Sequence, residues 1–315
     1  MPSSAVRTFT DPDDYAAAIR ATRAELTVTA RGRFTARLTR IDLHLLWMQR
    51  FSENLPRIVN SANVSGRAII WFRTRPGPGA RANGVEMLPT NLIRFSEAQN
   101  YFSQSSGSAC WGAMSLSVED MASVGSAMAG CDIVPPKDAL TVSPRPSAMA
   151  RLQRLHAAAG RLAEEAPEII ADPDAARGLE QALIEAMVAC LGKGEIGEDS
   201  VAQRHHMLVM RRFRRVVEEN PTEPLYMPEI CRAIQVSSRT LRACCQEHLG
   251  MGPKQYLLLR RMHLARRTLR ETAAGGATVT EIASGYGFWH FGRFAGAYRS
   301  LFGEMPSETL HRSPV

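Results

Sequence analysis

Apolar and polar positions divide the chain into three regions of different texture. The first opens with a capped helical pattern, Thr10-Asp11-Pro12-Asp13-Asp14 followed by residues 15–19. From residue 25 to residue 142, short alternating apolar segments are interrupted by turn residues, including a loop at 75–79 that contains two prolines and two glycines. This pattern predicts about six to eight strands in a small antiparallel barrel or sandwich.

A helical period replaces the alternation after a proline-rich hinge that ends at Pro146. Two apolar stripes at helical spacing follow the hinge: Leu152, Leu155, Ala159 and Leu162, and then Leu179, Leu183, Ala186, Met187, Cys190 and Leu191. Stripes of this kind are buried against each other or against a second subunit. Residues 192–200 are expected to form a linker.

The last third of the chain contains a helix-turn-helix pattern that occurs twice. Ile230-Cys231, four residues and Val236-Ser237 match Ile282-Ala283, four residues and Phe288-Trp289. A small residue near the end of one helix lets a second helix cross it closely and leaves that helix free to enter a groove.

Caps and glycines support these helix boundaries. Ser237 has the position of an N-cap, and Thr278 and Glu281 have the spacing of a capping box. Gly250 and Gly303 are expected to end the second helix of each unit. Residues 253–270 are expected to form one rigid connecting helix with five arginines.

Positive charge is concentrated in this region. Residues 204–315 contain 17 Lys and Arg against 9 Asp and Glu, a net charge of +8, whereas residues 1–203 contain 21 against 22, a net charge of −1. A basic domain beside a neutral one is typical of a polyanion-binding protein. Two tandem helix-turn-helix patterns favour DNA over an accidental basic face of a helical bundle. We expect residues 204–315 to fold alone. Removal of Arg260 or Arg266 from the connecting helix is expected to weaken binding to all DNA sequences alike.

Composition excludes several classes of protein. The length of 315 residues and the apolar fraction of 45% are typical of a globular chain with about two domains. No apolar run approaches the ~20 residues of a membrane span, and no signal core precedes residue 10, so we expect a cytoplasmic protein without membrane contact. The six cysteines include no C-x-x-C pair, which indicates reduced thiols.

Residues 204–311 resemble the DNA-binding domain of the AraC/XylS family of bacterial transcription regulators. The resemblance is carried by Val236-Ser237-x-x-Thr240-Leu241, Gly252-Pro253, Gly287-Phe288, Phe294, Tyr298, Phe302-Gly303 and Pro306-Ser307. The segments 286–294 and 304–310 look most like the branch that contains the ethanolamine-utilisation operon activator, and residues 33–71 resemble that branch more faintly. The resemblance implies an α+β chain that is a regulator, expected to be an activator, and not an enzyme.

The resemblance also implies which side chains read DNA. The first recognition helix would present Ser237, Ser238, Arg239, Arg242 and Ala243, and the second would present His290, Gly292, Arg293 and Gly296. Arginine to guanine is the commonest specific contact in the major groove. Family members often have a long polar residue at the position of Gly296, so the second helix has few readers. For Trp289, packing on the turn and contact with DNA remain equally open.

Three segments follow from this architecture: a cupin-like effector-binding β domain (1–146), a helical dimerisation segment with linker (147–203) and the tandem helix-turn-helix domain (204–315). Candidate effector contacts are Trp47, Trp71, Phe72, Arg73 and Arg94, each of which can equally be ordinary core. His44 is the only histidine of residues 25–142, which argues against a metal site, and no cofactor is expected. The expected partners are promoter DNA, a small organic effector (an amine such as ethanolamine or another metabolite), a second subunit and RNA polymerase, with the protein on the nucleoid when bound.

Alternatives from other classes remain. Residues 104–111 resemble the nucleophile segment of papain-type proteases, with Cys110 as nucleophile and His248 at a suitable distance, but Cys110 lies in a predicted strand and His248 in a recognition helix. The adjacent Cys244 and Cys245 suggest a redox sensor. A non-specific DNA-coating protein is the third alternative.

Overall fold

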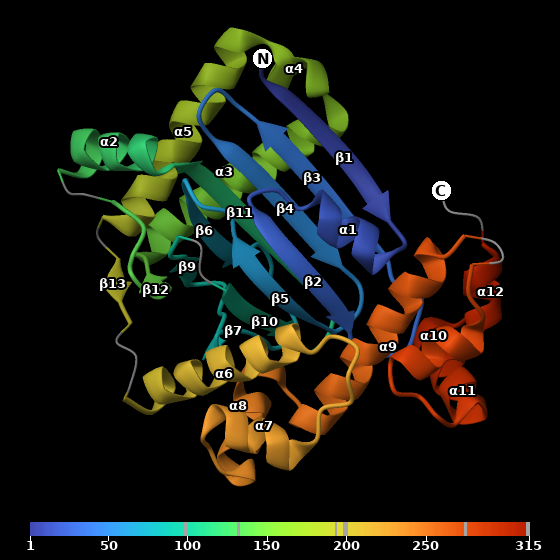
Figure 1. Cartoon of the computed structure of the whole chain (residues 1–315). Coiled ribbons are helices and arrows are strands. Elements are labelled where there is room, and N and C mark those ends of the chain that lie inside the picture. The colour runs from blue at the N-terminus through green and yellow to red at the C-terminus, as the bar shows by residue number, and fades with distance from the viewer. Residues whose placement is uncertain (98–99, 131–132, 193, 198–200, 274–275, 313–315) are drawn as a thin grey trace.

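The structure is a computed structural model, and it describes residues 1–97, 100–130, 133–192, 194–197, 201–273 and 276–312. Its N-terminal half consists of two antiparallel sheets, and its C-terminal part is helical (Figure 1). The texture change in the sequence therefore corresponds to a change of architecture. Cys131 and parts of the expected linker, residues 193 and 198–200, lie outside the described residues.

The larger sheet has the strand order β1-β3-β4-β11-β6-β9-β12-β13. Its strands are Ser3–Phe9 (β1), Ala36–Asp42 (β3), Trp47–Glu53 (β4), Ala109–Ser117 (β11), Arg67–Arg73 (β6), Leu92–Arg94 (β9), Leu140–Ser143 (β12) and Glu195–Ile196 (β13). The smaller sheet has the order β2-β5-β10-β7-β8, with strands Thr22–Val28, Arg57–Asn63, Asn100–Ser105, Ala80–Ala82 and Val85–Glu86. The predicted antiparallel β domain is thus confirmed, although β1 precedes the part of the chain in which strands were expected.

Strand alternation gives the larger sheet two apolar faces. In β6, Trp71 packs in the core between the two sheets, whereas Phe72 packs on the outer face. In β11, Trp111 points between the sheets and Met114 points outward. The sheet is therefore buried on both sides, which explains why its strands are so apolar.

Helices cover the outer face of this sheet. They are Val118–Ala129 (α2), Pro146–Glu165 (α3), Pro167–Ala171 (α4) and Pro173–Leu191 (α5), and α1 (Pro12–Ala18) lies at the end of β1 (Figure 1). Both expected stripes exist, and Leu152 and Leu183 are fully buried in one core with Phe72 and Met114. Of the two alternatives for these stripes, the structure shows burial within the chain.

The C-terminal helices form two units around a connector. The first unit contains Met227–Ile234 (α7) and Ser238–Leu249 (α8) and is preceded by Val201–Glu219 (α6). The second contains Val279–Gly285 (α10) and Phe291–Phe302 (α11) and is followed by Pro306–His311 (α12). The connector α9 (Pro253–Glu271) is a single helix of 19 residues, as expected. No helix among the described residues is both long and apolar enough to cross a membrane.

Candidate nucleic-acid interface

The first helix-turn-helix unit consists of α7, a three-residue turn and α8. Gln235 ends α7 in the left-handed conformation with φ of 57°, and the hydroxyl of Ser237 accepts a hydrogen bond of 3.1 Å from the N–H of Thr240 at the start of α8. Leu241, Cys244 and Cys245 are fully buried on the inner side of α8. The opposite side, with Ser238, Arg239, Arg242 and Ala243, is exposed. We call this unit, α7 and α8, the proximal unit.

The second unit, α10 and α11, is the distal unit. Thr278 and Glu281 form the expected capping box: the Glu281 N–H donates to the Thr278 hydroxyl at 3.2 Å, and the Thr278 N–H donates to the Glu281 carboxylate at 2.7 Å. The turn contains Gly287 with φ of 73°, and Phe294 and Tyr298 hold the inner side of α11 in the core. Gly250 and Gly303 end α8 and α11 in the left-handed conformation, as predicted.

The outer side of α11 has few side chains. His290, Gly292, Arg293 and Gly296 are all exposed, as a DNA-reading surface requires. A Cβ added at Gly292 or Gly296 would meet nothing within 4 Å, so the glycines are not needed for packing inside this chain. The surface therefore lacks side chains at two positions where there is space for them.

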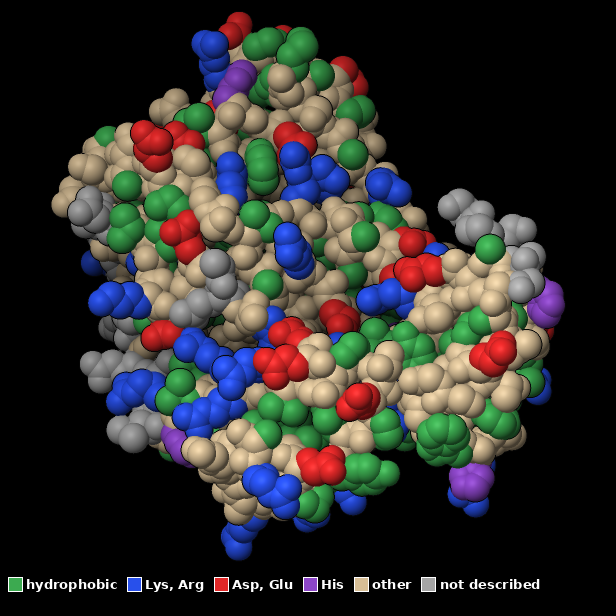
Figure 2. Space-filling model, viewed as in Figure 1, with side chains coloured by type: hydrophobic (Ala, Val, Ile, Leu, Met, Phe, Trp, Pro, Cys, Tyr) green, Lys and Arg blue, Asp and Glu red, His purple; other side chains and the backbone are tan. Residues whose placement is uncertain are grey.

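Trp289 does not pack on the turn. Its side chain is 69% exposed, and the neighbouring Phe291 is 41% exposed. Phe288 is the residue that packs there, because its ring lies 4.8 Å from the ring of Phe294. Of the two alternatives for Trp289, the structure therefore contradicts packing. Lys and Arg side chains project beside both units along the lower edge of the molecule (Figure 2).

The arginines of the connector α9 correct an expectation. Arg260 and Arg266 were expected to affect all DNA sequences alike, as phosphate contacts would, but their side chains are only 6% and 10% exposed. Arg260 donates to the Glu25 carboxylate at 2.8 Å, and Arg266 donates to Asp11 at 2.6 Å. Both arginines face the β domain, where carboxylates neutralise their positive charge. Part of the +8 charge is therefore not available to DNA.

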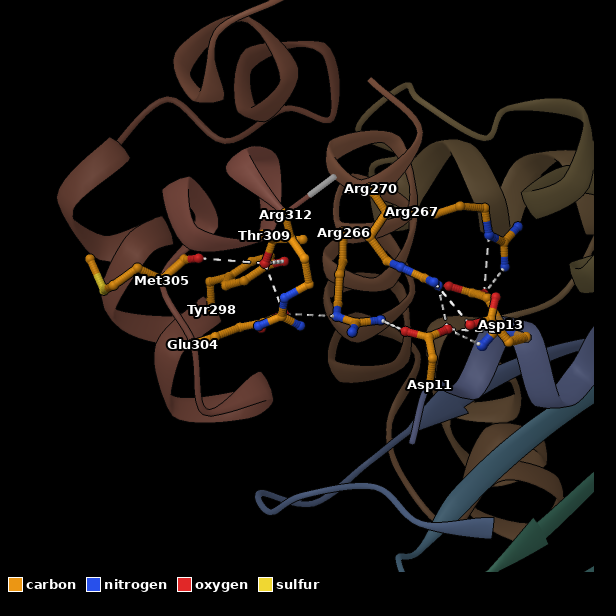
Figure 3. A network of polar contacts seen from close by, with 11 residues as sticks. Asp11, Asp13, Arg266, Arg267, Arg270, Tyr298, Glu304, Met305, Thr309 and Arg312 are labelled. Carbon is orange, nitrogen blue, oxygen red and sulfur yellow. Dashed lines mark hydrogen bonds and ion pairs between the residues drawn. The ribbon is translucent and has the colours of Figure 1, made fainter. Parts of the chain in front are cut away.

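Further ion pairs extend this contact into a network between α1 and α9, which we call the aspartate clamp. It consists of Asp11, Asp13 and Asp14 on one side and Arg266, Arg267 and Arg270 on the other (Figure 3). Arg266 also lies 3.5 Å from the carboxylate of Glu304, just after the end of α11, and Glu304 in turn pairs with Arg312. Burial alone would raise the pKa of Asp11, but Arg266 and Arg270 outweigh it and lower that pKa below 3.8. Asp11 is therefore charged at neutral pH.

The proximal unit is attached differently. Ile58 of β5 and Phe102 of β10 belong to the same buried core as Phe213, Leu249 and Tyr256. The rings of Phe102 and Tyr256 meet edge to face at 6.1 Å. A shared core of this kind argues against the expectation that residues 204–315 fold alone, because the isolated fragment would expose these apolar side chains to water.

A cavity lies between the two sheets. Trp47 and Trp71 line it, as expected for effector contacts, but Phe72, Arg73 and Arg94 do not. Phe72 points to the outer face of the sheet, Arg73 donates to the Met87 carbonyl at 3.3 Å, and Arg94 donates to the Val134 carbonyl at 2.7 Å. These three side chains therefore point away from the cavity that Trp47 and Trp71 line.

The sequence reasoning missed the polar centre of this cavity. Arg57, 2% exposed, donates to the Glu53 carboxylate at 2.8 Å and to the Ser103 hydroxyl at 3.1 Å. Aromatic rings surround the pair, with Trp71 and Trp111 stacked at 4.0 Å and Phe95 and Tyr101 stacked at 4.3 Å. The one signal in the sequence is an Arg four residues after a Glu within the predicted β region, because charges that a sheet buries must be paired.

The alternative chemistries gain no support from the geometry. The Cys110 sulfur lies 3.7 Å from the Ser52 hydroxyl, while His248 is buried beside Glu247 in the proximal unit. Burial, with a smaller effect of Glu247, raises the pKa of Cys244 to about 11, and burial also raises the pKa of Cys245, so both thiols stay protonated. Among the described residues there is no group of three or more His, Cys, Asp or Glu that fits a metal ion.

Comparison with known proteins agrees with this geometry. Residues 230–312 match a family model described as a helix-turn-helix domain. The chain is 40% identical over 103 residues to the XylDLEGF operon transcriptional activator of Pseudomonas putida, a match that covers 32% of each chain. It is 40% identical over 98 residues to the probable thc operon regulatory protein of Rhodococcus erythropolis, which covers 31% of this chain and 30% of that protein. The chain thus matches about a third of the length of these relatives.

Solved structures give longer but weaker matches. The AraC-like transcriptional activator CuxR is 16% identical with a TM-score of 0.41, and the match covers 90% of this chain and 100% of that one. ToxT of Vibrio cholerae is 13% identical with a TM-score of 0.29, over 93% of this chain and 98% of that one.

Two similar units joined by one helix place the C-terminal region in the class of tandem helix-turn-helix domains. Within this class, residues 230–312 match a helix-turn-helix domain model, and the relatives of this region are transcription regulators.

Proposed function

We propose that the protein is a sequence-specific, DNA-binding transcription regulator that inserts α8 and α11 into successive major grooves of promoter DNA. One observation carries the proposal: two capped helix-turn-helix units have their second helices exposed on the side opposite their cores. A rigid helix of 19 residues fixes their separation. Ser237, Ser238, Arg239, Arg242 and Ala243, together with His290, Gly292, Arg293 and Gly296, form the reading surface.

The proposal assigns three segments to this function. Residues 1–146 bind an effector in a cupin-like domain, residues 147–203 support a homodimer, and residues 204–315 bind DNA. Because the apolar stripes of α3 and α5 are used inside the chain, the homodimer uses another surface of this segment. The regulator acts as an activator with RNA polymerase in the bacterial cytoplasm, on the nucleoid when bound to DNA. Sedimentation of the full chain as a monomer, both free and on DNA, would contradict the dimer.

The cavity between the sheets is the proposed effector site. Its aromatic walls and its buried Arg57–Glu53 pair favour a small organic metabolite with an unsaturated ring over a small amine such as ethanolamine. The branch resemblance in residues 286–310 keeps the amine as the alternative. Thermal unfolding of the purified chain with each class of compound distinguishes the two, because a ligand stabilises only the state that binds it.

A short path connects this cavity to the DNA-binding domain. The hydroxyl of Tyr15 in α1 donates to the Glu53 carboxylate at 2.9 Å, and the amide of Gln49 pairs with the backbone of Arg20 just after α1 at 2.9 and 3.1 Å. The same helix α1 supplies Asp13 and Asp14 to the aspartate clamp, and its N-cap is Asp11. An effector that displaces Glu53 would therefore shift α1 and, with it, the clamp on α9.

A selection experiment followed by competition tests the central proposal. The full chain selects sites from a random DNA pool, and its affinity for the best site is compared with that for bulk DNA. We expect a preference of about a thousandfold or more. Equal affinity for all sequences would favour the alternative of a non-specific DNA-coating protein.

The enzyme alternative has its own test. We expect Cys110→Ser to leave DNA binding unchanged, because Cys110 contacts only the strand side chain Ser52 in the hydrogen bonds of the described residues. Hydrolysis of peptide or ester substrates by the wild-type chain, lost in this variant, would support a cysteine hydrolase and contradict the proposal.

A further inference from the structure

The distal unit exposes aromatic side chains where the proximal unit exposes polar ones. Trp289 and Phe291, which we call the aromatic tip, are 69% and 41% exposed at the start of α11. The corresponding start of α8 carries Ser237, Ser238 and Arg239. Single exposed apolar side chains are common, but two large aromatic groups two residues apart form a patch, and such patches are typical of contact sites.

We propose that the aromatic tip reads the C5-methyl groups of thymine in the distal half of the DNA site. This inference rests on the proposed DNA-binding function and concerns the kind of contact that α11 makes. The first residues of a recognition helix are those that approach the base edges. In the major groove, the thymine methyl is the apolar group that a base edge offers.

Glycines bring the aromatic tip close to the bases. Gly292 and Gly296 are exposed, and open space surrounds the position of a Cβ at each of them. Without side chains at these positions, the backbone of α11 can lie deeper in the groove than that of α8. The two glycines therefore remove polar side chains that could read bases, and they also favour contact through Trp289 and Phe291.

Charge around the aromatic tip identifies DNA as its partner. His290 lies between the two aromatic residues in the sequence. Arg293 follows Phe291 by two residues and is exposed. A basic rim around an apolar contact fits phosphates around base edges, whereas a protein partner that binds through this tip would have to be acidic and is an outcome of the test.

Replacement of thymine by uracil removes only the methyl group and so tests the contact directly. Each thymine in the distal half of the selected site is replaced in turn, and the affinity of the full wild-type chain is measured. We expect about three- to fourfold weaker binding at one or two positions, the effect of one buried methyl group. No change at any distal thymine, with specific binding intact, would overturn this inference and leave the proposed function standing. Failure of the wild-type chain to bind any unmodified site specifically would overturn both.

Protein variants assign the effect to the aromatic tip. Trp289→Ala should weaken binding to the thymine site by a similar factor and remove its sensitivity to uracil, and Phe291→Ala should do so at a neighbouring position. Leu208→Ala is the matched control, because Leu208 is 51% exposed on α6, outside both helix-turn-helix units, and should change neither value. Undiminished sensitivity to uracil in Trp289→Ala and Phe291→Ala would overturn the assignment, as would loss of an acidic protein partner in these variants without any change in DNA affinity.

Discussion

The proximal and distal units have the same local architecture but are attached to the β domain by different forces. The proximal unit shares an apolar core with Ile58 and Phe102 of the smaller sheet. The distal unit and the end of α9 have a core of their own, from Met262 to Tyr298, and the contacts from α9 to α1 are ion pairs. Apolar contacts depend on the area that they bury, whereas ion pairs depend on charge, and salt screens the exposed pairs most. The proximal unit is therefore held by apolar burial, and α9 is held to α1 by charge.

This difference suggests how an effector changes DNA binding. In the function that we propose, both recognition helices fit successive grooves about 34 Å apart, so a small rotation of the distal unit would decide whether both can bind. The aspartate clamp holds α9 close to the distal unit and far from the shared core. Movement of α1 would therefore alter the distal unit first.

The largest expected effect comes from breaking the shared core. Phe102→Ala should lower the free energy of unfolding by about 3–5 kcal/mol, because it leaves a cavity beside Tyr256. The loss should be equal at low and high salt, and denaturant unfolding followed by circular dichroism measures it. The matched control is Phe95→Ala in the core between the sheets, which should cost a similar amount without exposing α8 or α9. A loss in Phe102→Ala below about 1 kcal/mol would contradict the dependence of the proximal unit on this core.

The second effect comes from the aspartate clamp. Asp11→Ala should cost about 3 kcal/mol, because it leaves the buried Arg266 with only the longer contact to Glu304 and removes the N-cap of α1. Hydrogen exchange should locate the loss in α9 to α12, and the difference from wild type should persist in high salt, because the pair is buried and screened little. Asp14→Ala is the control, since Asp14 is 58% exposed and its pair with Arg270 should contribute about 0–1 kcal/mol. Equal losses of unfolding free energy in Asp11→Ala and Asp14→Ala would show that burial does not determine how much an ion pair of the clamp contributes.

The contrast between the units also separates what the sequence predicts from what it does not. The caps at Ser237 and Thr278, the glycines that end α8 and α11, and the length of α9 are local features, and all were predicted correctly. The partners of Arg260 and Arg266 were not, because Glu25 and Asp11 are more than 200 residues away in the chain. Local pattern carries no information on such pairings.

The candidate effector site shows the same limit. Alternation in β6 places Trp71 and Phe72 on opposite faces of the strand, so only one of them can line the cavity, but the pattern alone does not say which face encloses it. The strand β1 was missed because its residues are mostly exposed or half-buried at the edge of the sheet. In both cases the packing of distant segments, not local propensity, decides the outcome.

Acid, unlike salt, should weaken the attachment of both the proximal unit and α9 to the β domain. His248 of the proximal unit and His263 of α9 are buried, and burial lowers the pKa of each to about 4 from 6.5. Between these values the unfolded chain binds more protons than the folded chain, so stability falls as the pH drops. From pH 7 to pH 5 we expect a loss of about 2 kcal/mol for each histidine, measured by denaturant unfolding.

The clamp itself should survive this change of pH. The pKa of Asp11 lies below 3.8, so Asp11 keeps its charge at pH 5. His263→Gln should reduce the pH dependence by the share of one histidine, because the amide can still donate to the Val28 carbonyl that lies 3.0 Å from His263. An unchanged pH dependence in this variant would contradict the buried, neutral state of His263.

The smallest expected effect, and the one closest to function, is a difference between the two halves of the DNA site. Arg239 and Arg242 are both exposed on α8, whereas Arg293 is the long polar reader on the outer side of α11, next to Gly292 and Gly296. A good arginine–guanine pair contributes about 1–3 kcal/mol of discrimination, so Arg239→Ala should relax base preference at one or two positions of the proximal half-site. Arg293→Ala should lower affinity but cost no more discrimination than Arg239→Ala.

Arg215→Ala, at a 75% exposed side chain of α6, is the control that removes an equal charge without touching either reading surface. Sites selected from a random pool by wild type and by each variant measure these preferences. One sharp block and one diffuse block in the wild-type selection would support the difference between the units, and two equally sharp blocks would contradict it.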